Sequence, residues 1–256
     1  APVLSPFDPV KQDLVNALAP PSSTHLLGTD KFGRDVLSRL LWGARVDLRV
    51  GFIAVLIPFV IGTVVGGVAG YFGGWVDTLI SRTMDVFLAF PILLFALALV
   101  GIIPDTAFGL QGDVLRVVLI VGIIGLSSWP YIGRIVRGQT LSLREKEFVD
   151  AARVAGAGTA RIIFKHILPN AVGVVIVSST LLMSGAILTE AALSFLGFGI
   201  VPPTPSWGNI ISEGRDHSVQ AWWIMLFPGI AISLATLGMN LLGDGLRDVL
   251  DPRSRR

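Results

Sequence analysis

The chain has 256 residues, of which 52% are hydrophobic and 15% are charged, and its mean hydropathy is +0.73. Soluble domains average about 25% charged residues, so this chain has too few charges to cover an aqueous surface. A net charge of +2 gives no indication of a nucleic-acid-binding surface, and the absence of cysteine excludes disulfides and thiolate metal sites. These properties are typical of a membrane protein.

The first 46 residues are polar and rich in proline, as is common in a segment just outside a membrane. The chain opens on Ala1 with the proline-rich stretch APVLSPFDPV. Residues 35–45 predict an amphipathic helix, because the valine and leucines share one side and the arginines lie on others. We expect this helix to lie on the membrane surface and residues 1–46 to form an extracytoplasmic segment.

Five runs without ionised side chains follow, and each is about long enough to cross a bilayer core of about 30 Å. Buried helices of a soluble protein are the alternative, but they would require five helices of unusual length in one small chain. The sequence therefore predicts an all-α, polytopic membrane protein with five transmembrane helices within residues 47–244. The runs are Val50–Val76, Val86–Pro104, Val117–Gly133, Ile167–Thr189 and Ser218–Gly243.

Prolines lie inside four of these runs, and residues 62–74 form a glycine-rich patch, GTVVGGVAGYFGG. A proline within a helix leaves a carbonyl without its partner and bends the helix. Glycines let neighbouring helices approach closely. Both features fit a bundle around a path and fit a plain packed bundle almost as well. The four prolines are Pro58, Pro91, Pro130 and Pro228.

The distribution of basic residues predicts the orientation of the chain. Most Lys and Arg residues fall near Arg82, between residues 134 and 165, and in the C-terminal tail, all on one side of a five-span arrangement. The positive-inside rule places this side in the cytoplasm, together with the tail at residues 245–256. Trp207, Trp222 and Trp223 would then form an interfacial belt on the outer side.

A charged segment rich in small residues, EFVDAARVAGAGTARIIFKHILPN, lies between two apolar runs at residues 147–170. Ser142 and Glu145 predict a capping box, so a helix should begin after Ser142. Gly156 is predicted to adopt the left-handed conformation that commonly follows the last residue of a helix. This helix should therefore end near Ala155. A second helical piece should begin at Thr159.

The first predicted helix has a face of one aromatic residue and several alanines, flanked by two acids. Such a face is too small to anchor in lipid but lets another backbone come close, so it suits a groove on a protein. An interfacial amphipathic helix would instead want larger apolar side chains opposite a basic face. The face comprises Phe148, Ala151, Ala152 and Ala155, and the acids are Glu147 and Asp150.

The spacing Asp150-Ala151-Ala152, three residues, Gly156, then Leu168-Pro169 resembles the EAA loop of ABC importer membrane subunits. Here Asp150 replaces the usual glutamate. The resemblance implies that residues 142–169 form the coupling loop, whose helix docks into a groove of an ATPase subunit. The implied coupling residues are Glu147, Phe148, Asp150, Ala151, Ala152, Ala155, Gly156, Leu168 and Pro169.

Four further stretches are similar to the second membrane subunit of dipeptide, oligopeptide and nickel importers, so the resemblance covers essentially the whole chain. It implies the type I ABC importer transmembrane fold, with six helices in the native subunit and one of them before Ala1. Peptides are the first expected substrate and nickel is the alternative. The stretches are LGTDKFGRDVLSRLLWGAR (27–45), TEAALSFLGFG (189–199), PPTPSWGNII (202–211) and GDGLRDVLDPRSR (243–255).

The same resemblance implies the surroundings of the chain. We expect a multi-pass protein of the bacterial cell membrane that forms half of a translocation path beside a second, related permease subunit. Two ATPase subunits would bind ATP and magnesium, and an extracytoplasmic binding protein would deliver the substrate. No cofactor in this chain and no nucleic-acid partner are expected.

The sequence itself argues against an enzyme. None of the four lysines follows a glycine, which excludes a GxxxxGK[ST] phosphate-binding loop. The three histidines are far apart and lack the spacing of a helical zinc site. An intramembrane aspartyl hydrolase using Asp85 and Asp244 is the remaining enzyme hypothesis, but both acids lie near arginines at the ends of spans, where solvated or paired charges are expected.

A self-sufficient secondary transporter is the second rival. It would need ionisable groups near the middle of the membrane, where this chain has mainly Ser, Thr and Asn. Glu190 follows a long apolar run near the end of its predicted helix and leaves two possibilities open. It is either a functional acid or a structural one paired with a base at the outer interface.

Overall fold

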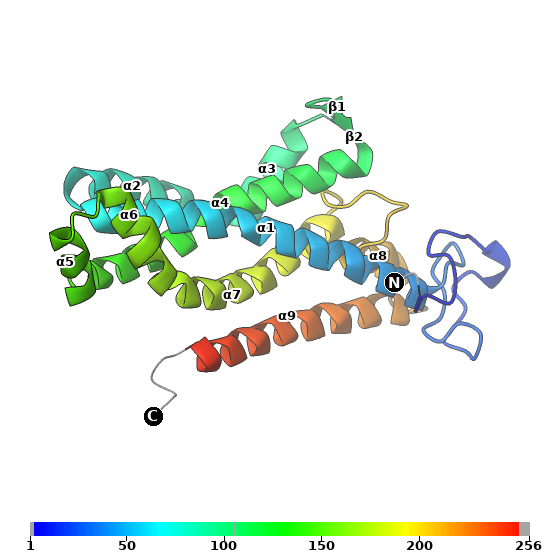
Figure 1. Ribbon diagram of the computed structural model, residues 1–256. Coiled ribbons are helices and arrows are strands. Elements are labelled where there is room, and N and C mark those ends of the chain that lie inside the picture. Colours follow the sequence, from blue (N-terminus) through cyan, green and yellow to red (C-terminus); the bar gives the residue numbers. More distant parts are fainter. Residues whose placement is uncertain (1–2, 105, 251–256) are drawn as a thin grey trace. The chain divides into compact units, whose positions relative to one another are not determined.

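The computed structural model describes residues 3–104 and 106–250, and Figure 1 shows the order of its elements. The predicted cytoplasmic tail at 245–256 lies outside the described residues from Asp251 onward. The main helices are α1 (Val36–Phe72), α2 (Gly74–Ala89), α3 (Ile92–Ile102), α4 (Gly112–Leu143), α5 (Glu147–Val154), α6 (Thr159–Arg161), α7 (Leu168–Phe195), α8 (Trp207–Gly214) and α9 (Trp223–Leu250). The shorter elements are η1 (Leu14–Asn16), β1 (Thr106–Ala107), β2 (Leu110–Gln111), the π-helix η2 (Ile162–Ile167) and η3 (Arg215–His217).

The membrane spans agree with the all-α, five-span prediction. Four helices are long and apolar enough to cross a membrane. α2 and α3 pass the same test together, although they are bent by 78°, and they make the fifth span if the pair is a broken span and not a re-entrant loop. The break falls at Phe90 and Pro91, because Phe90 is extended, as a residue before proline prefers. The four unbroken spans are Val36–Phe72, Gly112–Leu143, Thr159–Phe195 and Trp223–Leu250. Pro58, Pro130 and Pro228 lie inside helices.

The amphipathic surface helix predicted over residues 35–45 is not a separate element. α1 begins at Val36 and continues into the membrane span without interruption. Val36, Ser38 and Arg39 are all buried. Arg39 pairs with the carboxylates of Asp30 and Glu213, and Arg45 lies over the Trp42 ring, so the start of this helix packs within the protein.

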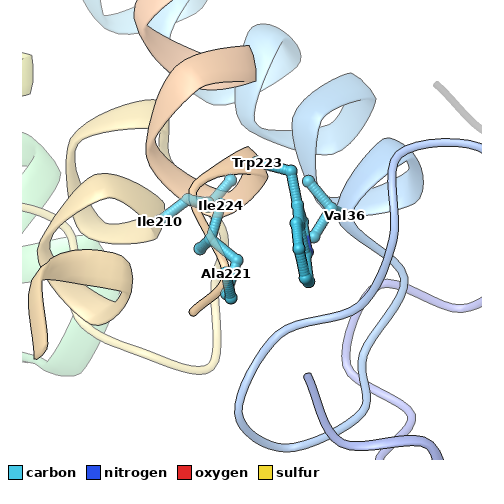
Figure 2. Close-up of a cluster of buried hydrophobic side chains, with 5 residues drawn as sticks. All are labelled: Val36, Ile210, Ala221, Trp223 and Ile224. Carbon is cyan, nitrogen blue, oxygen red and sulfur yellow. The ribbon is translucent and has the colours of Figure 1, made fainter. Parts of the chain in front are cut away.

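The chain divides into two compact units, and the first comprises residues 1–53, 93–123 and 184–238. Its core joins the start of α1 to α8 and the start of α9, and Figure 2 shows the Trp223 ring facing Val36. The indole nitrogen of Trp223 donates to the Thr29 carbonyl at 3.0 Å, and that of Trp207 donates to the Leu40 carbonyl at 3.1 Å.

These contacts correct the predicted aromatic belt. Trp207 and Trp223 are buried, and only Trp222 is exposed. Trp207 and Trp223 therefore fill the protein interior instead of an interface with lipid.

A buried ion network stabilises the same unit. The Asp30 carboxylate accepts from Arg34 at 2.7 Å and from Arg39 at 2.5 Å. Arg39 also donates to Glu213 of α8 at 2.7 Å. Because burial of unpaired charges is costly, each member needs the others, and together they fix the N-terminal segment against α1 and α8.

Glu190 is fully buried, and Ser194 donates to its carboxylate at 2.6 Å. Asp47 of α1 lies close enough to interact with it electrostatically, while the Trp207 amide donates to Asp47 at 2.8 Å. The predicted pairing of Glu190 with a base is therefore wrong, since its partners are a hydroxyl and a second acid. Glu190 lies in the packed interior that joins α1, α7 and α8.

The second unit comprises residues 54–92, 124–183 and 239–256. Here α1 and α4 touch through glycines, as the glycine-rich patch predicted. A methyl group added to Gly66 would lie 2.3 Å from the Gly133 carbonyl oxygen, and one added to Gly70 would lie 2.7 Å from the Arg137 carbonyl oxygen. Such close backbones leave no room for side chains between the two helices.

Candidate coupling site

α5 is a short helix between two membrane spans, and its start differs from the prediction. α4 continues through Leu143, because the Arg144 amide still donates to the Thr140 carbonyl at 2.9 Å. Ser142 therefore lies in the last turn of α4 and caps nothing. α5 begins at Glu147, with Lys146 as an N-cap that makes no side-chain hydrogen bond, so the predicted capping box is wrong.

The end of α5 agrees with the prediction. Gly156 has a φ of +79°, the left-handed conformation that glycine adopts without steric cost. The Gly156 amide donates to the Arg153 carbonyl at 2.9 Å, and the Ala157 amide donates to the Ala152 carbonyl at 3.0 Å. These two bonds form a Schellman motif, which satisfies carbonyls that the helix end leaves free.

One face of α5 packs against this chain itself. Val149 and Ala152 form a buried cluster with Ile162 and Ile167, and Tyr71 packs against it. The prediction that Ala152 shares one open face with Phe148 is therefore wrong. Ala152 is instead buried together with Val149, so its small side chain serves close packing within the chain.

The opposite face of α5 is open. Val154 is 90% exposed and Phe148 is 39% exposed. The exposed residues predicted as coupling residues are Glu147, Phe148, Asp150, Ala151, Ala155 and Gly156 in this segment, and Pro169 further on. We call the side chains of Phe148, Ala151, Val154 and Ala155 the outer face of α5.

Charged side chains surround the outer face. Arg153 donates to Asp150 at 2.8 Å, one turn earlier in the helix. A hydrogen bond with the Tyr71 hydroxyl raises the pKa of the Arg153 guanidinium, and the charge of Asp150 adds to this shift. Arg153 therefore carries its charge at every physiological pH.

The second helical piece begins at Thr159, as predicted, and passes through η2 into α7. Pro169 is the second residue of α7 and lies inside the continuous helical run Thr159–Phe195, directly after the π-helical turn η2. Leu168 is buried in a cluster with Ile163 and Val136. Leu168 therefore does not join the outer face of α5 and serves the packing of the loop's rear half.

Two exposed apolar residues of the segment were missed by sequence reasoning. Val154 lies three residues after Ala151 on the same side of the helix, and this spacing could have identified it. Phe164 is 55% exposed, but it lies in η2, and the π-helical turn shifts residues away from the regular helical spacing. A pattern search that assumes an α-helix misplaces it.

The structure offers no buried site for the hydrolase hypothesis. The Asp85 side chain is about half exposed, and its carboxylate oxygens lie 2.5 Å from a guanidinium nitrogen of Arg134 and 3.6 Å from one of Arg82. Asp244 is exposed. Among residues 3–104 and 106–250, no three His, Asp or Glu side chains are grouped as a metal site would require.

Residues 62–256 match the family described as binding-protein-dependent transport system inner membrane component. The dipeptide transport system permease protein DppC of Alkalihalophilus pseudofirmus is 46% identical over the whole of this chain and 81% of its own length. The di/tripeptide permease DppC of Pseudomonas aeruginosa is 42% identical over 99% of this chain and 82% of its own. The glutathione transport system permease protein GsiD of Pectobacterium atrosepticum is 43% identical over 91% of this chain and 74% of its own length.

A solved structure of the MetNI methionine ABC transporter in an inward-facing conformation is similar with a TM-score of 0.65. The alignment covers 84% of this chain and 97% of that one at 18% identity. At this identity the likeness concerns the fold alone, which is the type I ABC importer transmembrane fold.

Proposed function

The chain belongs to the binding-protein-dependent transport system inner membrane components, and on this premise we propose that it imports peptides as one permease subunit of an ATP-driven transporter. Relatives that share over 40% of its residues are named for dipeptides, di- and tripeptides and glutathione. These names favour peptides over nickel, the alternative substrate of the same architecture.

The exposed outer face of α5 carries the proposal. A short helix rich in small residues, held from behind by a buried cluster, presents Val154 and Phe148 outward beside the charges of Asp150 and Arg153. An apolar centre with a charged rim is the usual composition of a protein interface. We infer that an ATPase subunit receives this face.

The expected assembly follows from one coupling helix per chain. A second, related permease subunit completes the path, two ATPase subunits bind ATP and magnesium, and an extracytoplasmic protein delivers the peptide. The coupling loop and the C-terminal tail face the cytoplasm, where ATP is available. A secondary transporter would instead work with an ion gradient alone, so ATP dependence of uptake separates the two classes.

The test changes the outer face without touching the buried one. Val154→Asp should lower co-purification of the ATPase subunits by about tenfold or more. A carboxylate buried in an apolar contact weakens the free energy of association by about 1.4 kcal/mol or more, which is tenfold in affinity. Val219→Asp is the matched control, because Val219 is 96% exposed and lies in the predicted external loop. Equal association of wild type and Val154→Asp would contradict the proposal, and equal losses in both variants would mean that the charge acts nonspecifically.

A further inference from the structure

Tyr71 is the last residue but one of α1, and its ring lies between two buried clusters. It packs against the cluster that Val149 and Ala152 of α5 form with Ile162 and Ile167. It also packs against the cluster that contains Val136 of α4 and Leu168 of α7. One side chain at the end of a membrane span thus packs against two clusters, whose members come from α5, from two further spans and from η2.

Polar contacts strengthen the same junction. The Arg153 guanidinium of α5 lies 6.0 Å from the centre of the Tyr71 ring and interacts with its hydroxyl. From the end of α4, Arg144 donates to the Gly70 carbonyl at 3.0 Å and to the Tyr71 carbonyl at 3.3 Å. These carbonyls belong to the last turn of α1, which leaves them without helical partners, so Arg144 caps α1.

α5 depends on this junction for its position. An isolated helix of eight residues is not stable in water, and its N-cap makes no side-chain bond. Its orientation is therefore set by the buried contacts of Val149 and Ala152. Among these contacts Tyr71 is the one that belongs to α1.

α1 can pass a displacement on because its cytoplasmic half is tightly packed. Gly66 and Gly70 contact the α4 backbone directly, and Gly67 contacts Leu168 of α7 so closely that an added methyl group would lie 2.8 Å from it. Packed interfaces of this kind shift as bodies and do not deform gradually. A force applied at the end of α1 therefore moves the packed segment, not a single side chain.

We propose that Tyr71 is a positioning residue that joins the coupling helix α5 to α1, so that the movement of α5 with an ATPase subunit is transmitted to the membrane spans. This inference rests on the proposed function, because it assumes that α5 is the helix that the ATPase subunit moves. It assigns to Tyr71 the coupling of hydrolysis to transport and not the binding of the ATPase subunit.

The test measures coupling separately from assembly. Proteoliposomes contain the permease pair, the ATPase subunits and the binding protein, and both ATP hydrolysis and uptake of radiolabelled alanyl-alanine are recorded. For Tyr71→Leu we expect normal co-purification of the ATPase subunits and continued hydrolysis, but a fall of about fivefold or more in peptide imported per ATP, the usual size of a lost coupling between sites. Tyr71→Phe keeps the ring and should lower the ratio by less than about twofold.

Tyr131→Leu is the matched control, because Tyr131 is the other of the two tyrosines and is exposed on α4. Its ratio should equal that of the wild type. If Tyr71→Leu does not accumulate in the membrane, Tyr71→Met, whose unbranched side chain adapts better to an irregular space, is measured in its place and is judged by the same ratio.

Each outcome decides one question. A wild-type ratio in Tyr71→Leu or its Met substitute, with uptake and association intact, would overturn the role of Tyr71 and leave the proposed function standing. An equal fall in Tyr131→Leu would also overturn it. Failure of the wild-type chain to retain ATPase subunits or to import with ATP would contradict the proposed function itself.

Discussion

Gly156 is a position where the backbone conformation decides which residue is tolerated. Its φ of +79° costs an L-residue about 1–2 kcal/mol, and a β-branched one more, so Gly156→Val should open the Schellman motif at the end of α5. We expect lower thermal stability of the purified complex and weaker association with the ATPase subunits. Both quantities can be measured on detergent-solubilised protein.

Gly158, two residues further on, provides the control. Its φ of −69° and ψ of 159° are open to any residue, and neither glycine has an atom within 4 Å of an added methyl group. Gly158→Val should therefore leave stability unchanged. If Gly156→Val and Gly158→Val change thermal stability and ATPase association by the same amount, the left-handed conformation of Gly156 does not contribute to the stability of the segment.

Ala151 and Ala152 are neighbours with opposite surroundings, and the same substitution should therefore have two different effects. Ala152 is 9% exposed inside the cluster behind α5, so Ala152→Trp should destabilise the chain by about 1–3 kcal/mol or more. Ala151 is exposed, so Ala151→Trp should leave insertion and stability normal but block the docked ATPase subunit.

Membrane-inserted amounts and co-purified ATPase subunits, measured for both variants, separate the two effects. The sequence predicted that Ala152 lies on the face that docks, and its burial transfers the expected clash with the partner to Ala151. Normal insertion of Ala152→Trp together with lost association would restore the original assignment.

At the scale of elements, the contact between α1 and α4 depends on glycine. Gly66→Ala would place a methyl group 2.3 Å from the Gly133 carbonyl oxygen, so the helices must separate, at a cost of about 1–3 kcal/mol. Gly138 lies on α4 with open space around it, and Gly138→Ala should stabilise the helix by up to about 1 kcal/mol. Thermal unfolding in detergent should shift in opposite directions for the two variants. A Gly66→Ala chain as stable as the wild type would mean that the helices part without loss.

Elements whose causes are local could be predicted from the sequence. Apolar runs predicted the membrane spans and Gly156 predicted the end of α5, whereas a bend was expected at each of four prolines and only Pro91 lies at a break between helices. The capping box failed although it is also a local pattern. Ser142 and Glu145 have the right spacing, but the α4 helix continues past Ser142, and a residue inside a helix cannot cap one.

At the scale of the whole molecule, contacts between distant parts of the sequence could not be predicted. Arg39 pairs with Glu213, 174 residues away, and Trp223 donates to Thr29 across 194 residues. From the sequence alone, an arginine in an amphipathic stretch and a tryptophan at the start of a span are both typical of a membrane interface. The candidate site shows the same division. Local patterns predicted its position and the end of α5, whereas the burial of Ala152 and the packing of Tyr71 depend on residues 162–167 and on α1.

The orientation of the whole chain is the last prediction, and the absence of cysteine makes it directly testable. The single span Thr159–Phe195 lies between position 146 and position 219, so the two positions must face opposite sides of the membrane. The excess of Lys and Arg around residues 134–165 places position 146 in the cytoplasm. Lys146→Cys and Val219→Cys both put a thiol on an exposed residue.

In sealed, right-side-out cells an impermeant maleimide should label the thiol at position 219 and spare the one at position 146. After permeabilisation, in membranes stripped of ATPase subunits, it should label both. The permeabilised sample shows that a missing signal reflects sidedness and not burial. Labelling of Lys146→Cys in sealed cells would place α5 outside the cytoplasm, where no ATPase subunit could reach its outer face, and would contradict both the orientation and the coupling role.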